Sequence, residues 1–260
     1  MGVEWDLVRS GPDAAEHGVL LLPGGAMAAR SYDEVMSQRA LGDTRLVAAT
    51  LPGHAGAPPP LDFSVESYAR DAAELAADQR CDVVVGFSMG ATVALEMVSS
   101  RLFAGPVVLL GISLSAQDEP GFFRAIVRLG DVLGGLPSAA LMRMTALATR
   151  GAHVSDEHRA RMRADLRAND PRVLRDGLKA YLQYLDRHQS PAERLCTAGV
   201  PAWVVHAKKG DGGLTDAERR TLVACPHTTL ITIPGTRYFL PDEEPERVAE
   251  IIAEAVGKAG

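Results

Sequence analysis

The sequence predicts an α/β protein in which a mainly parallel central sheet is covered by helices on both faces. Short apolar runs alternate with segments whose apolar residues recur at helical spacing, which is typical of this class. The apolar runs are nearly continuous, as expected for strands buried on both faces, and turn residues follow each of them. The expected strands are 19–22, 45–50, 82–85, 107–110, 202–206 and 229–233.

Helices are expected between these strands. Ser64 precedes a segment whose apolar residues, from Val65 to Ala76, recur at helical spacing, and a serine at this place is suited to cap a helix. The same spacing returns near the C-terminus, from Val248 to Val256. These segments supply the helical layers that a parallel sheet needs.

The interval 113–192 differs from the rest because it offers helical patterns and no convincing strand. Asp170 followed by Pro171 is typical of a helix start, and a regular apolar stripe from Leu174 to Leu185 follows it. A helical insertion between two strands is expected to form a lid over the strand ends. The predicted organisation is therefore an α/β core at 1–112 and 193–260 with a helical cap at 113–192.

Composition indicates a soluble globular protein, with neither nucleic acid nor a membrane expected as a partner. The 260 residues are 47% apolar and 23% charged, and the net charge of -6 does not favour nucleic acid as a partner. No apolar run approaches the roughly 20 residues of a membrane span, and the N-terminus lacks the apolar stretch of a signal peptide. Cys81, Cys196 and Cys225 are expected to be free thiols in a reducing compartment, so a cytoplasmic location is expected. The oligomeric state is not indicated.

Four arginines between residues 159 and 167 form a basic cluster. Acidic residues, Asp165 among them, are interleaved with the arginines. This mixed pattern predicts the solvated face of a helix rather than a binding patch.

The chemistry-bearing motif is Gly86-Phe87-Ser88-Met89-Gly90, between a predicted strand and a predicted helix. In this context G-x-S-x-G indicates a sharp, strained turn that projects the Ser88 hydroxyl, while residues two positions to either side must be small. The N-terminus of the following helix favours developing negative charge. Ser88 is therefore the candidate nucleophile.

With this motif the chain resembles the α/β-hydrolase superfamily, in its lid-bearing branch, over essentially its full length. The segment 21–26, Leu-Leu-Pro-Gly-Gly-Ala, resembles the oxyanion loop, with Pro-Gly where the family usually has His-Gly. The segment 51–56, Leu-Pro-Gly-His-Ala-Gly, resembles the Pro-Gly-His-Gly segment after the next strand. The tail from Ile233 to Glu246 resembles the last catalytic loop and helix.

The resemblance implies a role for several residues. The backbone N–H groups of Gly25 and Met89 would form the oxyanion hole, which in acyl transfer contributes several kcal/mol. Asp211 would be the acid of the triad, with Asp216 the weaker candidate. Tyr238 stands where the family has its histidine. A phenol with a pKa of about 10 cannot take the serine proton as imidazole does near neutrality.

Other histidines are poor substitutes for the missing base. His54 follows a strand that lies two places from that of Ser88 in the family's order, about 10 Å sideways. His206 is expected to make a structural hydrogen bond at a strand end. The remaining histidines are expected on the surface or in the lid: His17, His153, His158, His188 and His227. None has metal-ligand spacing, so neither a metal nor another cofactor is expected.

Three hypotheses remain open at this stage. The protein is a serine hydrolase of an ester, thioester or similar acyl bond, with a non-standard proton acceptor. Alternatively, it is a silent or non-hydrolytic member that binds a small apolar ligand under the lid. A third hypothesis is that Tyr238 is an introduced substitution, although trapping variants usually carry Ala, Gln or Asn at the histidine. The serine disfavours dehalogenase and epoxide-hydrolase chemistry, whose members use aspartate at the elbow.

Overall fold

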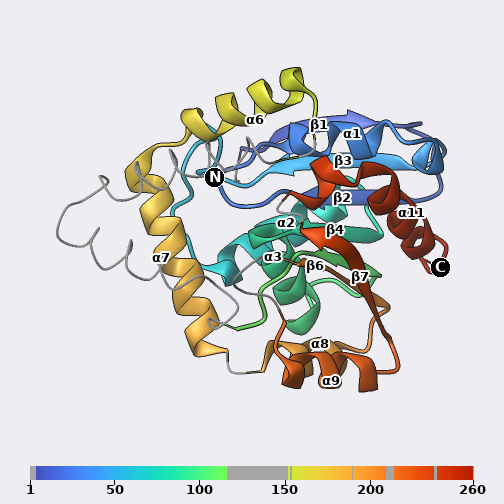
Figure 1. Cartoon of the computed structure of the whole chain (residues 1–260). Helices are drawn as coiled ribbons and strands as arrows, with labels where there is room; N and C mark the ends of the chain where they lie inside the picture. The colour runs from blue at the N-terminus through green and yellow to red at the C-terminus, as the bar shows by residue number, and fades with distance from the viewer. Residues whose placement is uncertain are drawn as a thin grey trace.

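A seven-stranded sheet runs through the centre of the molecule (Figure 1). The computed structural model describes residues 4–115, 152, 154–188, 190–208, 214–236 and 239–259. The strands are β1 (Asp6–Ser10), β2 (Gly18–Leu22), β3 (Arg45–Thr50), β4 (Val83–Phe87), β5 (Val107–Leu110), β6 (Ala202–Lys208) and β7 (Thr228–Thr236). The helices are η1 (Ala29–Tyr32), α1 (Asp33–Met36), η2 (Arg39–Leu41), α2 (Val65–Asp78), α3 (Met89–Ser99), α6 (Asp156–Ala168), α7 (Pro171–Arg187), α8 (Pro191–Ala198), α9 (Asp216–Ala224), α10 (Leu240–Glu243) and α11 (Pro245–Val256).

The strand order is β1-β3-β2-β4-β5-β6-β7, and β2 to β7 pair in parallel. The predicted α/β class with its six parallel strands is confirmed. β1 was missed by the sequence analysis: it pairs antiparallel with β3, with Asp6 opposite Thr50. Its side chains are exposed or half-buried, so this edge strand lacks the apolar run by which the others were predicted.

Alternate residues of each strand pack into two separate cores, one on each face of the sheet. In β2, Leu20 and Leu22 face the core formed with α2, α3 and α8, whereas Val19 and Leu21 face the core formed with η1, α1 and α11. This alternation follows from the two-residue period of a strand. It explains why the strands are apolar throughout, since both of their faces are buried.

Side-chain caps begin several helices where the sequence predicted them. The Ser64 hydroxyl accepts a hydrogen bond from the N–H of Ser67 at the start of α2. Asp170 accepts from the N–H groups of Arg172 and Val173 at the start of α7. Each cap satisfies backbone donors that have no partner within the helix.

Two helices of the predicted cap interval, α6 and α7, lie between β5 and β6 in the chain and are called here the insertion helices. Figure 1 shows them together at one end of the molecule, α6 toward the top and α7 toward the left. Their junction covers the loops after β2 and β3, where Asn169 forms hydrogen bonds with Ala26 and Ala55. Within the described part of the interval 113–192 there is no strand. The cap boundaries remain a prediction.

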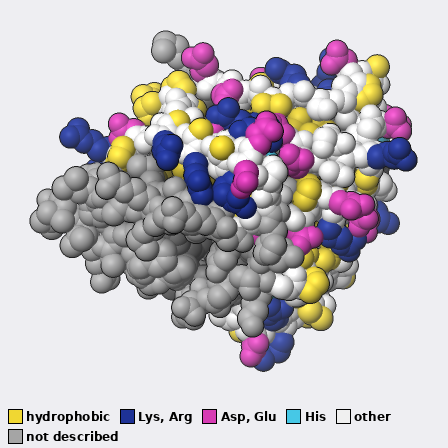
Figure 2. Space-filling view, turned by 45° about the horizontal axis from the view of Figure 1, so that its top comes forward, with side chains coloured by type: hydrophobic (Ala, Val, Ile, Leu, Met, Phe, Trp, Pro, Cys, Tyr) yellow, Lys and Arg dark blue, Asp and Glu magenta, His cyan; other side chains and the backbone are white. Residues whose placement is uncertain are grey.

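The basic cluster on α6 was predicted to form only a solvated face, and this is wrong for part of the helix. Asp165 is buried and forms an ion pair with Arg30 of η1. Met162 and Leu166 are buried beside it because α6 rests on the core along that side. On the outer surface, basic and acidic side chains are interspersed over the face shown in Figure 2.

The three cysteines are free thiols, as expected. None of the helices in the described ranges is both long and apolar enough to span a membrane.

Candidate active site

Ser88 occupies the sharp turn between β4 and α3. Its backbone has φ 50° and ψ −114°, a conformation that costs a non-glycine residue of the order of 1–3 kcal/mol. Hydrogen bonds hold it there: the Ser88 N–H donates to the carbonyl of Leu110 at 2.9 Å, and its own carbonyl accepts from the N–H groups of Ala91 and Thr92. The hydroxyl does not cap the helix. The turn therefore leaves a half-buried serine hydroxyl at the carboxyl end of a central strand.

The two glycines of the motif make this turn possible. A Cβ atom on Gly86 would lie 2.2 Å from the carbonyl oxygen of Gly90, and one on Gly90 would lie 2.2 Å from that of Leu22. Both contacts are with backbone, which cannot move aside like a flexible side chain. The expectation that small residues must flank Ser88 at both positions agrees with this geometry.

The loop after β2, residues 23–28, lies directly against the elbow and is called here the oxyanion loop after the family segment that it resembles. A Cβ atom on Gly25 would be 3.6 Å from Sδ of Met89, so the two residues whose N–H groups are the proposed oxyanion donors are in contact. Within the described residues, neither of their N–H groups has a hydrogen-bond acceptor. Free donors next to a candidate nucleophile are what an oxyanion hole requires. Their role in catalysis remains a prediction.

His54 lies after β3, and the sheet order β3-β2-β4 places that strand two positions from the strand of Ser88, as expected. The side chain is 2% exposed, and its Nδ1 accepts a hydrogen bond from the N–H of Ala26 at 2.9 Å. Burial lowers the pKa of His54 to about 4. An imidazole that accepts at Nδ1 and is neutral carries its proton on Nε2. His54 therefore has no free lone pair with which to act as a base.

Asn169, at the C-terminal end of α6, is a residue of this region that the sequence analysis missed. Its amide donates to the carbonyl of Ala26 at 3.0 Å, and its side-chain oxygen accepts from the N–H of Ala55 at 2.8 Å. Nothing in the local sequence distinguishes this asparagine from an ordinary helix-end residue. Its importance follows only from the packing of the insertion on the oxyanion loop.

His158 was expected on the surface or in the lid, and the surface expectation is wrong. It is 5% exposed on α6, and its Nε2 lies 2.6 Å from Oδ1 of the buried Asp242. The hydrogen bond to Asp242 raises the pKa of His158 despite burial, with Glu34 adding to this and Arg161 opposing it. Burial raises the pKa of Asp242, against the stabilising contact with His158. This pair joins the insertion helix α6 to α10, the short helix that follows β7.

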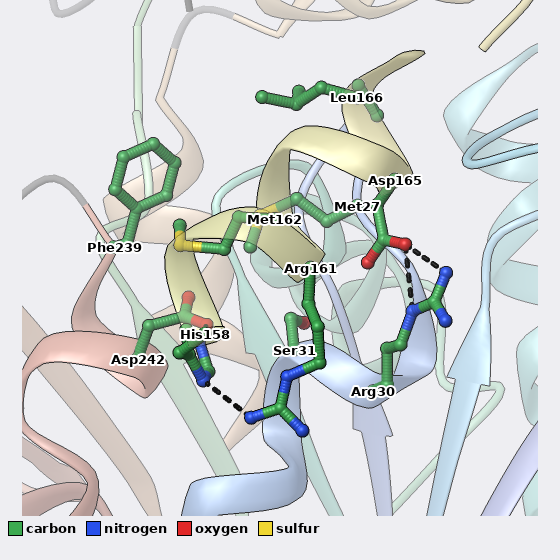
Figure 3. Close-up of a pocket in the computed structure, with 11 residues that line it drawn as sticks. Met27, Arg30, Ser31, His158, Arg161, Met162, Asp165, Leu166, Phe239 and Asp242 are labelled. Atoms are coloured by element: carbon green, nitrogen blue, oxygen red, sulfur yellow. Dashed lines mark hydrogen bonds and ion pairs between the residues drawn. The ribbon is translucent and has the colours of Figure 1, made fainter. Parts of the chain in front are cut away.

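A small pocket of about 20 Å³ lies where α6, the oxyanion loop and the start of α10 meet (Figure 3). Apolar side chains line one part of it, including Met27, Met162 and Phe239. On the polar side, Oγ of Ser31 and Oδ2 of Asp242 are buried without a hydrogen-bond partner among the described residues. A polar cavity of this size accommodates about one water molecule.

Asp211 and Tyr238 lie outside the described residues, so their positions relative to Ser88 remain predictions. The strands that lead to them are described: β6 ends at Lys208 and β7 at Thr236. These strands are parallel neighbours, and only β5 separates β6 from the strand of Ser88. The chain thus leaves the sheet toward Asp211 and Tyr238 at the edge where Ser88 lies.

His17 lies at the opposite edge of the sheet from Ser88. Its Nδ1 is 2.7 Å from Oδ2 of Asp82, whose other oxygen accepts from the N–H of Gly18 at the start of β2. His227 is exposed and immediately precedes β7, and His206 is buried within β6. His17 and His227 precede the starts of their strands, at the edge of the sheet opposite Ser88, and are not placed to serve it. Within the described ranges, no group of three or more His, Cys, Asp or Glu side chains could hold a metal ion.

A serine held at positive φ between a central parallel strand and a helix, with free backbone donors beside it, defines the class of nucleophile-elbow α/β proteins. The chain belongs to the alpha/beta hydrolase family, whose model matches residues 19–251.

Solved structures of the same fold come from several bacteria. The esterase from Thermogutta terrifontis has a TM-score of 0.78 at 18% identity, covering 99% of this chain and 94% of that one. Cfl2 from Burkholderia cenocepacia has a TM-score of 0.75 at 21% identity, covering 98% and 92%. A bromoperoxidase from Bacillus anthracis has a TM-score of 0.77 at 16% identity, covering 98% and 96%. At these identities the likeness concerns the fold. No curated protein matches the chain.

Proposed function

We propose that this protein is a serine hydrolase in which Ser88 attacks the carbonyl carbon of a carboxylic ester, thioester or related acyl bond. The observation that carries the proposal is the backbone of Ser88, held at φ 50° between β4 and α3 by the close approach of Gly86 and Gly90. Strain of this kind persists only where the surrounding structure enforces it, and it is concentrated at functional sites.

In the proposed reaction, attack by the Ser88 hydroxyl oxygen forms a tetrahedral intermediate that carries negative charge on the former carbonyl oxygen. The N–H groups of Gly25 and Met89 donate hydrogen bonds to that oxygen, and the N-terminus of α3 adds the positive end of its dipole. Collapse of the intermediate expels an alcoholate or thiolate, which takes up one proton in place of the one that Ser88 releases to solvent, and leaves an acyl-enzyme that water then cleaves. We propose that this acyl substrate is small and apolar.

The proton of the Ser88 hydroxyl must leave as the new bond forms, and this step limits the proposed enzyme. Tyr238 takes the place of the family's histidine, with Asp211 as the acid, and a phenol is a poor acceptor near neutral pH. Loss of the base in a serine triad costs on the order of a million-fold in turnover. We therefore propose weak hydrolysis of activated acyl substrates.

A second candidate function is binding of a small apolar ligand without hydrolysis. The state of His54 favours this second function, because the histidine of the family-like Pro-Gly-His segment is engaged at Nδ1 and has a pKa of about 4. His54 is therefore not available as a base for hydrolysis. Similar structures include an esterase and a bromoperoxidase, so the fold is compatible with more than one chemistry.

The test is covalent labelling with a fluorophosphonate probe, followed by peptide mapping of the modified residue. We expect labelling at Ser88 in the wild type, none in Ser88→Ala, and wild-type labelling in the control Ser37→Ala, whose exposed serine ends α1 and bonds the carbonyl of Glu34. Labelling at another residue, or none at all, contradicts the proposed nucleophile.

A further inference from the structure

Hydrogen bonds hold the backbone of Ala26 from both sides. Its N–H donates to Nδ1 of His54 at 2.9 Å, and its carbonyl accepts from the side-chain amide of Asn169 at 3.0 Å. Ala26 itself has φ 65°, a left-handed conformation that alanine adopts only at a cost of about 1–2 kcal/mol. The conformation of this residue is therefore imposed by its two partners and does not follow from its own preference.

The two partners are themselves joined. Asn169 accepts a hydrogen bond from the N–H of Ala55, the residue next to His54, at 2.8 Å. The result is a closed circuit that runs from Ala26 through His54 and Ala55 to Asn169 and back. Ala26, His54 and Asn169 are 7%, 2% and 5% exposed, so water does not compete for these bonds.

The circuit fixes the residue that follows two glycines, Gly24 and Gly25. Gly24 and Gly25 have no side chains to restrict their backbone, and glycine is the most permissive residue in φ and ψ. The N–H of Gly25 is a free donor beside Met89, and its direction depends on how the following peptide groups are fixed. A flexible oxyanion donor must be held in place before the reaction, since reorganisation during the reaction lowers its rate.

We propose that His54 and Asn169 are positioning residues that fix the oxyanion loop, and that docking of α6 thereby prepares the site for catalysis. The inference rests on the proposed hydrolase function. Asn169 belongs to the insertion, whereas His54 belongs to the core, so the circuit exists only when α6 is docked. Two other contacts hold α6 at the same place: the ion pair of Arg30 with Asp165 and the contact of His158 with Asp242.

Paired substitutions separate this role from general base catalysis. An asparagine at position 54 offers an oxygen near the position of Nδ1, whereas a glutamine offers its polar end near the position of Nε2. His54→Asn should therefore keep the bond from Ala26, and His54→Gln should lose it. Asn169→Leu removes all four hydrogen bonds of the side-chain amide, including those with Ala26 and Ala55, and Asn169→Asp keeps only the acceptor for Ala55. Arg187→Gln is the matched control, because it breaks an exposed ion pair with Glu66 that ties α7 to α2 away from the loop.

The first readout is hydrogen exchange of the Ala26 amide by NMR, measured in Ser88→Ala so that it does not depend on turnover. We expect exchange to rise at least about tenfold in His54→Gln and to remain near the reference in His54→Asn and Arg187→Gln, since exchange reports local opening. Asn169→Leu should also raise it, and Asn169→Asp serves if the leucine variant does not fold.

The second readout is hydrolysis of p-nitrophenyl esters. We expect His54→Gln and Asn169→Leu to lower kcat about tenfold to a hundredfold, with KM within about twofold of the wild type. This loss of kcat is somewhat smaller than the one caused by removing a whole oxyanion donor. Equal losses in His54→Asn and His54→Gln overturn the proposal, because a base at Nε2 would then explain them. Unchanged exchange and kcat in all variants also overturn it. Absence of turnover in the wild type contradicts the hydrolase function. In that case hydrogen exchange of the Ala26 amide alone tests whether His54 and Asn169 fix the loop.

Discussion

Nδ1 of His54 accepts the backbone N–H of Ala26 at 2.9 Å, within a buried environment that keeps the imidazole neutral. The family-like Pro-Gly-His segment therefore supplies a structural acceptor for the oxyanion loop. Because the proton lies on Nε2, this histidine is not available to accept one from Ser88. The same relationship has a consequence for the stability of the protein in acid.

We predict that the free energy of unfolding rises with pH across the window in which His54 titrates. The folded pKa is about 4 and the unfolded value is 6.5, so between them the unfolded state binds more protons. Stability is then lost as the pH falls, by about 3 kcal/mol over the whole window. Urea unfolding of the wild type and His54→Asn at several pH values measures this contribution.

The comparison with His54→Asn isolates this histidine, because His158 titrates in both proteins. The raised pKa of His158 acts in the opposite sense: its contribution is present at low pH and is lost as pH rises through the folded pKa. A stability difference between wild type and His54→Asn that does not change from pH 7 to pH 4 contradicts the prediction.

Substitution of Gly90 by alanine should destabilise the protein strongly. The new methyl group would lie 2.2 Å from the carbonyl oxygen of Leu22 and 2.6 Å from that of Pro23, both in the backbone of the neighbouring loop. We expect a loss of about 3 kcal/mol or more in thermal or urea unfolding, at the upper end of overpacking effects. Gly257→Ala is the control: its nearest contact would be 3.6 Å, and its stability should stay within about 0.5 kcal/mol of the wild type.

Introducing a histidine at position 238 should raise the esterase activity. If Asp211 and the loop around residue 238 lie as the family resemblance implies, Tyr238→His supplies the missing proton acceptor, and hydrolysis of p-nitrophenyl esters should increase by at least about a hundredfold. The wild-type rate should change little between pH 6 and 8, whereas the variant should gain a step near the histidine pKa of about 6.5. Both rates should vanish when Ser88→Ala is added.

A robust wild-type rate with its own step near pH 6.5 would mean that another histidine serves Ser88. His54→Asn and His158→Gln would then be assayed, since these are buried histidines around the oxyanion loop and the last loop. No turnover in any of the variants would favour ligand binding over hydrolysis.

Glu96 forms a buried network that should contribute to stability independently of the site. On α3, Oε2 of Glu96 accepts from the hydroxyl of Tyr184 at 2.7 Å and pairs with Arg194 at 2.6 Å, while Ser100 bonds its other oxygen. Burial raises the pKa of Glu96, but these bonds outweigh it and lower the pKa overall. We expect Glu96→Gln to cost about 3 kcal/mol in urea unfolding, as for a broken buried pair.

The sign of its pH dependence follows from the lowered pKa. The contribution of Glu96 should be complete above its unfolded pKa of about 4.5 and should be lost as the pH falls through the folded value. A double-mutant cycle with Arg194→Gln should show coupling of about 1 kcal/mol or more. The exposed pair of Arg187 and Glu66 is the matched control, with coupling below about 0.5 kcal/mol. Equal coupling energies in the two cycles would contradict the larger stabilising contribution predicted for the buried Glu96 network.

Local sequence signals predicted the elements that depend on neighbouring residues. The apolar runs marked six strands, Ser64 and Asp170 marked helix starts, and the glycines around Ser88 marked the elbow. β1 was missed because its pairing with β3, and not any apolar run of its own, makes it a strand. The free donors of Gly25 and Met89 were placed by family resemblance, and the structure brings these two residues together.

The sequence by itself determined the α/β class, the strained serine turn and the absence of a histidine from the last loop, because each depends on residues within a few positions of one another. Only the tertiary structure decided what His54, Asn169 and His158 do. Asn169 lies 143 positions from Ala26, and His158 lies 84 positions from Asp242. The spacing of apolar residues along the sequence does not predict contacts between residues so far apart. They form when α6 docks on the core and excludes water, and burial then sets both the hydrogen-bond partners and the protonation of each side chain.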